Sequence, residues 1–184
     1  MSRLRAAADP DRRARYEAVF REVYEPLQRY ALRRTSPGAA DDVVAEALTV
    51  LWRRLDEVPD GVALPWCYGV TRRCLANQRR GEARQQRLVD RLGAEPAAGV
   101  EGAAEYDAEL DAALAELADD DRELVRLWAW EQLPPREIAV ALDITANAAS
   151  IRLHRAKQRL SESLARKNAA PAGHEVVGHA KEAP

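Results

Sequence analysis

The chain has 184 residues, of which 47% are hydrophobic, 32% are charged and 5% are aromatic. This composition is typical of a globular protein built from helices, and no apolar run is long enough to span a bilayer. The first residues carry arginines without the apolar segment of a secretion signal, so we expect a cytoplasmic protein. The formal net charge of −2 at first argues against nucleic acid as a partner.

The charges are, however, unevenly distributed along the chain. Basic residues dominate 72–91 and 152–167, and an acidic stretch separates these two blocks. The positive and negative charges cancel only in the total for the chain, so each basic block can still attract phosphate locally. A solvated helix face explains either block alone equally well, so the charge pattern allows a nucleic-acid partner without requiring one.

Hydrophobic periodicity in the first half of the chain predicts three helices and no strand. The first helix is expected over residues 12–34, where Pro26 interrupts the pattern. The second ends near Leu55, and the third runs from Trp66 to about Arg91. The third helix begins apolar and ends strongly basic.

The second half predicts another helical unit after a break. Residues 93–102 are rich in Ala, Gly, Pro and Glu and carry no periodic apolar stripe, which indicates a linker. Helical periodicity resumes near Tyr106. We therefore predict an all-α fold of two small helical domains joined by a flexible acidic linker. The expected divisions are a flexible N-terminus 1–11, a first domain 12–91, the linker 92–105, a second domain 106–167 and a disordered tail 168–184.

The most informative local pattern runs from Leu133 to Leu160. Two prolines open a short helix, Asp143 can take the left-handed conformation in the following turn, and Thr145 can cap a second helix. This order predicts a helix-turn-helix, whose second helix fits the major groove of DNA. The outer side of that helix carries polar and basic side chains that can read guanine or bind phosphate. The alternative is an ordinary helical hairpin with a solvated face.

This stretch resembles region four of the extracytoplasmic-function (ECF) group of sigma-70-type RNA polymerase sigma factors. The resemblance rests on Glu137-Ile138-Ala139 in the first helix and Arg152-Leu153-His154-Arg155-Ala156 in the second. Asp143 and Asn147 stand where glycine is common in the family. The resemblance implies that the second helix reads the −35 promoter element through Asn147, Ser150, Ile151, Arg152, His154, Arg155 and Arg159. Among these, Arg152 and Arg159 look more like framework or phosphate contacts.

The segment Asp42–Leu55 resembles the region-two helix that binds the clamp of RNA polymerase in this family. Asp42 and Glu46 share a helix face and can pair with arginines of a partner helix. Ala45 replaces the usual glutamine and Leu48 the usual phenylalanine. The resemblance implies polymerase contacts by Asp42, Glu46, Leu48 and Trp52.

The segment Pro65–Arg80 resembles the family's helix for the −10 element. Residues 56–64 form the loop that would receive a flipped base of the non-template strand, and cationic groups must offset the free energy of extruding that base. The resemblance implies strand contacts by Arg72, Arg73, Asn77 and Arg80. Trp66 is expected in the core rather than as a stacking platform.

The resemblance covers residues 16–164 and implies three partners: core RNA polymerase, through its beta-prime clamp and beta flap, promoter DNA, and an anti-sigma factor. A stand-alone helix-turn-helix regulator is the alternative function. We expect no enzyme, no cofactor and no small-molecule substrate, because the three histidines lack catalytic partners and no phosphate-binding glycine loop occurs. Cys67 and Cys74 are expected to be buried free thiols, rather than a redox pair or metal ligands.

Overall fold

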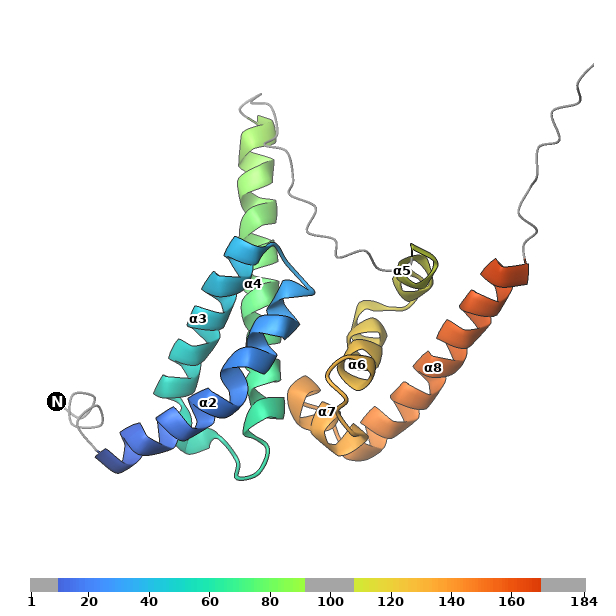
Figure 1. The fold of residues 1–184 in the computed structure, drawn as a ribbon. Helices are drawn as coiled ribbons and strands as arrows, with labels where there is room; N and C mark the ends of the chain where they lie inside the picture. The colour runs from blue at the N-terminus through green and yellow to red at the C-terminus, as the bar shows by residue number, and fades with distance from the viewer. Residues whose placement is uncertain (1–9, 92–107, 170–184) are drawn as a thin grey trace, which may run out of the picture.

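The computed structural model describes residues 10–91 and 108–169, and every regular element within them is helical. The all-α prediction is thereby confirmed for this part of the chain. The predicted linker lies outside it, as do most of the N-terminal segment and of the tail. None of the described helices is both long and apolar enough to cross a membrane. In chain order the elements are α2 (Pro10–Leu32), α3 (Pro37–Arg53), the 3-10 helix η1 (Leu55–Glu57), α4 (Ala63–Arg91), α5 (Ala108–Ala115), α6 (Asp119–Ala129), α7 (Pro135–Leu142) and α8 (Ala146–Ala169) (Figure 1).

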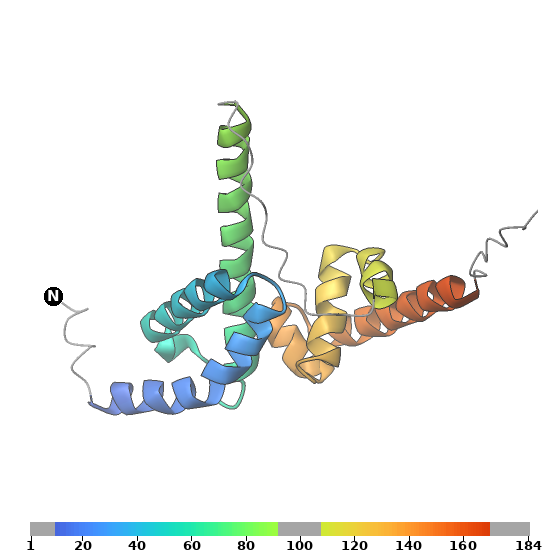
Figure 2. The same cartoon turned by 45° about the horizontal axis from the view of Figure 1, so that its top comes forward.

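Helices α2, α3 and α4 form a first helical unit around an apolar core. Val23 and Leu27 on α2, Leu51 on α3 and Cys67 on α4 lie on the inner faces of these helices and are buried. Helix α2 continues through Pro26 without a break. The C-terminal part of α4 projects beyond the bundle in both views (Figures 1 and 2), and its side chains are largely exposed up to Leu88.

Helices α5 to α8 form a second unit, which contains the predicted helix-turn-helix. Pro135 opens α7, and Asp143 ends it in the left-handed conformation, with φ 56° and ψ 49°. The N–H of Ala148 donates to Oγ1 of Thr145 at 3.1 Å, so Thr145 caps the start of α8. The turn chemistry read from the sequence is therefore confirmed, and it sets the angle between α7 and α8.

The two units share one apolar core, which was not predicted. Leu127 and Ile138 of the second unit belong to the same buried cluster as Tyr68 of α4. Helix α7 lies between α4 and α8 (Figure 1). The contact is closest at Gly69, where a Cβ atom would lie 2.7 Å from the carbonyl oxygen of Ala141 on α7. A side chain at residue 69 would therefore push the two units apart.

Cys67 and Cys74 are free thiols and both are buried in α4, as predicted. Burial raises the pKa of Cys67 to about 12 and that of Cys74 to about 11. Since the thiolate is the reactive form, both thiols are held in an inert state at neutral pH. Among the described residues, no group of His, Cys, Asp and Glu side chains is arranged to hold a metal ion.

Candidate nucleic-acid and polymerase interfaces

The outer face of α8 is open to solvent. Ile151 is 44% exposed, and its neighbours on this face are exposed as well. Ser150 donates its hydroxyl to the carbonyl oxygen of Ala146 at 3.0 Å, which leaves the hydroxyl oxygen able to accept. Five members of the predicted −35 set are exposed on this outer face: Asn147, Ser150, Ile151, His154 and Arg155. A contiguous polar face of this size on a capped helix can lie in the major groove.

Arg152 and Arg159, the other two members of that set, point back toward α6. Both pair with Asp121, which is 9% exposed. Arg152 donates to Oδ1 of Asp121 from Nε at 3.1 Å and from Nη2 at 2.9 Å, and Arg159 donates to Oδ2 from Nη1 at 3.1 Å. In this structure the two arginines hold α8 against α6.

A second carboxylate holds the C-terminal part of α8. Glu116, just after α5, accepts a hydrogen bond from Ser163 at 2.7 Å and pairs with Arg166 at 2.8 Å and with Lys167 at 3.4 Å. The hydrogen bond from Ser163 and the two cations lower the pKa of the Glu116 carboxyl, against the opposing effect of desolvation. With its two ends tied to α5 and α6, α8 presents a fixed outer face.

Helix α4 carries the predicted −10 residues on its exposed side. Arg73, Asn77 and Arg80 are exposed, and Arg80 donates to the side-chain oxygen of Asn77. Arg72 is different, because its Nη2 donates to Oδ1 of Asp120 on α6 at 2.7 Å. One of the four predicted side chains is thus engaged by the second unit, while the other three are open to solvent.

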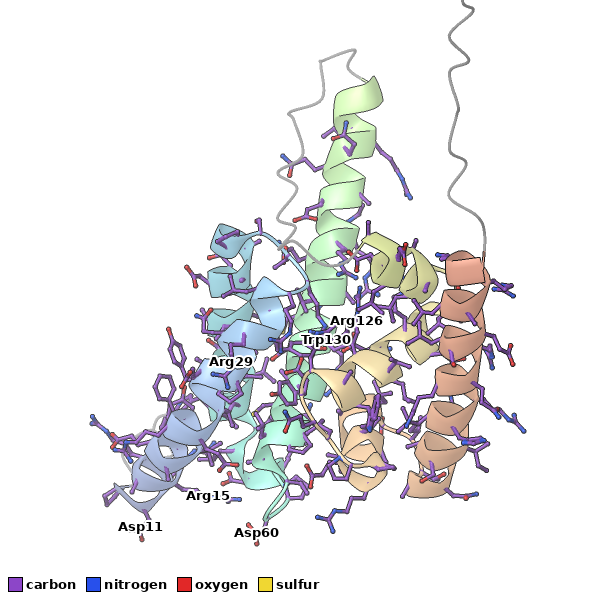
Figure 3. All side chains as sticks on the ribbon, turned by 45° about the vertical axis from the view of Figure 1, so that its right-hand side comes forward. Asp11, Arg15, Arg29, Asp60, Arg126 and Trp130 are labelled. Atoms are coloured by element: carbon purple, nitrogen blue, oxygen red, sulfur yellow. The ribbon has the colours of Figure 1, made fainter. Side chains whose placement is uncertain are left out.

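The loop before α4 is anchored to the start of α2. Arg12 pairs with Asp56 and donates to the carbonyl oxygen of Trp52 at 2.7 Å. Arg15 donates to the carbonyl oxygen of Val58 at 3.1 Å and pairs with Asp60 at 3.6 Å. Arg15 and Asp60 lie together at one edge of the molecule (Figure 3). The loop predicted to receive a flipped base therefore has a defined position.

The predicted polymerase contacts on α3 divide into two kinds. Asp42 and Glu46 are exposed, and Glu46 also contacts the Cys74 thiol. Leu48, however, is 9% exposed. Trp52 packs edge-on against Tyr16 with ring centroids 5.1 Å apart. The acidic face of α3 is available to a partner, whereas Leu48 is buried in the first unit and Trp52 is partly exposed.

An ion-paired network crosses the junction between the two units, and sequence reasoning missed it. The hydroxyl of Tyr30 donates to Oε1 of Glu123 at 2.6 Å, and Arg34 pairs with the same carboxylate at 3.1 Å. Arg34 also stacks on the Tyr30 ring, at 3.6 Å from its centroid, and pairs with Glu131 at 3.4 Å. Arg33 pairs with Glu131 at 2.5 Å. The side chains of Arg34 and Glu131 are each only 3% exposed.

The network determines the protonation of the groups within it. Burial, then the neighbouring Glu123 carboxylate, raises the pKa of Tyr30 well above its usual value. Burial alone would lower the pKa of Arg34, but Tyr30, Glu123 and Glu131 outweigh that effect and the pKa is raised. Tyr30 is therefore a neutral hydrogen-bond donor and Arg34 a buried cation between two carboxylates.

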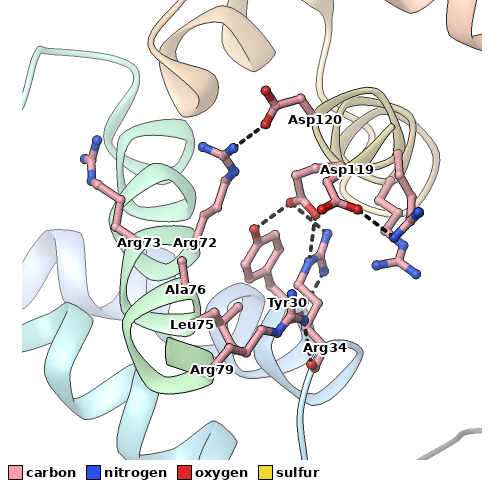
Figure 4. A pocket seen from close by; sticks show the side chains of 12 residues that line it. Tyr30, Arg34, Arg72, Arg73, Leu75, Ala76, Arg79, Asp119 and Asp120 are labelled. Atoms are coloured by element: carbon pink, nitrogen blue, oxygen red, sulfur yellow. Dashed lines mark hydrogen bonds and ion pairs between the residues drawn. The ribbon is translucent and has the colours of Figure 1, made fainter. Parts of the chain in front are cut away.

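A cavity of about 380 Å³ opens beside this network, between α2, α4 and α6 (Figure 4). Arg72, Arg79 and Arg126 line it, together with Asp119 and Asp120. Figure 3 places Arg126 and Trp130 in the middle of the molecule, where the two units meet. The junction therefore combines an apolar contact at Gly69, buried ion pairs and an arginine-rich opening.

A capped helix-turn-helix beside a second, strongly basic helix defines a helical DNA-binding protein. The family described as Sigma-70, region 4 matches residues 107–160. Over 172 residues the chain is 30% identical to the ECF RNA polymerase sigma factor SigL of Mycobacterium tuberculosis, covering 89% of this chain and 96% of that one. The chain belongs to the ECF RNA polymerase sigma factors.

Two further comparisons agree with this assignment. The RNA polymerase sigma-E factor of Streptomyces antibioticus is 34% identical over 155 residues, which cover 79% of this chain and 84% of that protein. The fold is similar to that of the sigma factor RpoE from Bartonella quintana, solved in complex with the anti-sigma factor NepR. The TM-score is 0.59 at 22% identity, over 82% of this chain and 96% of that one.

Proposed function

We propose that this sigma factor acts in the cytoplasm, has no catalytic activity of its own, and directs core RNA polymerase to promoters through two separate DNA contacts. The observation that carries the proposal is the outer face of α8, which is exposed while Asp121 and Thr145 hold the helix from behind. A recognition helix with a fixed pose loses little conformational freedom when it enters the major groove. This is the arrangement that sequence-specific readout needs.

In this proposal α8 reads the −35 element as duplex DNA. His154 and Arg155 can donate to base edges, and the Ser150 hydroxyl oxygen can accept from one. Ile151 can contact a thymine methyl group, and Asn147 lies at the end of the helix that enters the groove first. Arg152 and Arg159 act as positioning residues, because both are paired with Asp121.

Helix α4 contacts the −10 element in the proposal. Arg73, Asn77 and Arg80 form an exposed polar and cationic edge, which suits the backbone of an unpaired strand. The anchored loop at residues 56–64 supplies the place for an extruded base. Arg72 joins this set only when it leaves Asp120.

The acidic face of α3 supplies the polymerase contact. Asp42 and Glu46 are one turn apart and exposed, so they can pair with basic side chains of a partner helix. We also propose an anti-sigma protein as a further partner, because RpoE, which shares the fold, was solved in complex with one.

The test combines the purified chain with core RNA polymerase from the source organism. Size-exclusion chromatography measures binding, and sequencing of transcripts made from genomic DNA measures promoter choice. We expect co-elution and transcripts that start downstream of one shared two-part motif. Absence of co-elution, with DNA binding retained, would instead favour a stand-alone helix-turn-helix regulator.

A further inference from the structure

The second unit covers part of the face of α4 that the proposed function assigns to promoter DNA. Asp120 on α6 places a carboxylate oxygen 2.7 Å from Nη2 of Arg72. A phosphate oxygen of DNA would make the same charge-assisted hydrogen bond to the same donor. Asp120 therefore occupies the place of a phosphate at one of the four predicted −10 contacts.

The pair between Arg72 and Asp120 does not by itself hold the units together. Both side chains are substantially exposed, at 38% and 61%, and exposed ion pairs stabilise a fold only weakly. The stabilising contacts lie deeper, where Arg34 is enclosed by Glu123, Glu131 and Tyr30. Removing a partner from such a pair leaves a buried charge uncompensated, which strongly destabilises the contact.

The backbones of α4 and α7 can approach each other this closely only because residue 69 is a glycine. Gly69 lies within α4, where alanine would favour the helix more. At this position, however, a Cβ atom would lie 2.7 Å from a backbone oxygen of α7. Backbone atoms cannot rotate away as a side chain does, so any residue other than glycine requires α4 and α7 to separate. Gly81, on the same helix, has no atom within 4 Å of such a Cβ position.

We propose that the face formed by α6 and α7 is an intramolecular competitor of promoter DNA, which docks on α4 at Gly69 and occupies Arg72 through Asp120. The free chain then rests in a closed arrangement, and binding of the −10 strand requires the two units to separate. This inference rests on the proposed function only in assigning Arg72 to the DNA strand. Closure itself is a property of the protein alone.

The experiment compares full-length Gly69→Ala with full-length Gly81→Ala, which makes the same change on the same helix away from the junction. Small-angle scattering gives the radius of gyration, and fluorescence anisotropy gives the affinity for a short single-stranded oligonucleotide of mixed sequence. If the closed form holds about nine-tenths of the molecules, Gly69→Ala should tighten strand binding about tenfold and increase the radius of gyration. Gly81→Ala should change neither quantity.

Asp120→Asn provides a second variant that leaves the backbone contact intact. It should free Arg72 and tighten strand binding without changing the radius of gyration. An unchanged radius of gyration in folded Gly69→Ala would overturn the closure. An increased radius with unchanged strand affinity in both variants would overturn the competition. Neither result bears on whether wild-type protein directs promoter-specific transcription by core polymerase, so failure of the proposed function is detected separately.

Discussion

Arg152 on α8 donates two hydrogen bonds to a single carboxylate oxygen of Asp121 on α6, from Nε at 3.1 Å and from Nη2 at 2.9 Å. The other oxygen of this carboxylate accepts from Arg159. One largely buried acid thus sets both the position and the rotation of the helix proposed to read DNA. Its importance can be measured apart from any direct DNA contact.

Asp121→Ala should lower the free energy of unfolding by about 1–2 kcal/mol, because three charge-assisted hydrogen bonds are lost while water solvates the two partly exposed arginines. Asp119→Asn is the matched control, since Asp119 lies in the same helical turn, is 95% exposed and pairs only with Arg122 among the described residues. Urea denaturation measures both variants. Equal effects of the two substitutions would contradict a specific role for Asp121.

Arg155→Ala should weaken binding to a −35 duplex by about 1–3 kcal/mol and leave the free energy of unfolding unchanged, because Arg155 is exposed and points away from the core. Competition between the promoter duplex and random duplex DNA measures the loss of specificity. Arg136→Ala on α7 removes another exposed arginine outside the proposed interface and should leave specificity intact. A uniform loss on both duplexes would indicate a phosphate contact instead of base readout.

Replacing Asp42 with Asn and Glu46 with Gln should weaken core-polymerase binding about tenfold or more, with a reduced salt dependence, because two exposed negative charges leave the α3 face. Surface plasmon resonance at several salt concentrations is the measurement. Glu25→Gln, which removes an exposed charge from α2, is the control. Undiminished binding by the double variant would place the polymerase contact elsewhere.

The buried thiols predict a decline of stability at alkaline pH. The pKa of Cys67 is raised from 9.0 to about 12 and that of Cys74 from 9.0 to about 11, chiefly by burial. A raised pKa in the folded state means that the stabilising contribution is fully present below pH 9 and is lost as the pH rises toward 11 or 12. Urea denaturation between pH 8 and pH 11 should show this fall. A Cys74→Ala variant should show less of it.

The rate of thiol modification tests the burial of Cys67 and Cys74 independently of the pH dependence. Both cysteines should react with a thiol reagent at pH 8 only as fast as the protein opens, and both should react at once in urea. Rapid modification of the folded protein would show that the first helical unit opens locally around α4.

Features that depend on a few neighbouring residues were predictable from the sequence. The left-handed Asp143 and the Thr145 cap each follow from the chemistry of a single side chain and its own backbone, so local residues alone were enough to place the helix-turn-helix. Apolar periodicity likewise predicted the helical fold, because every helix that buries one face repeats its apolar residues with the same period along the sequence. Helices α2 and α4 begin at Pro10 and Ala63, a few residues before their predicted starts, since proline is compatible with the first turn of a helix.

Contacts between distant parts of the chain were decided only by the tertiary structure. In the sequence, Asp121 and Glu123 are two charges of the acidic stretch between the basic blocks, and only folding brings them to Arg152 and Arg34. Gly69 carried no local signal, because its requirement arises from a backbone oxygen 72 residues further along the chain, at Ala141. The sequence by itself determined which helices form and which faces are apolar or basic. Only the packing of those faces decided which charges are paired and which remain open to DNA, because pairing depends on distances through space and not on spacing along the chain.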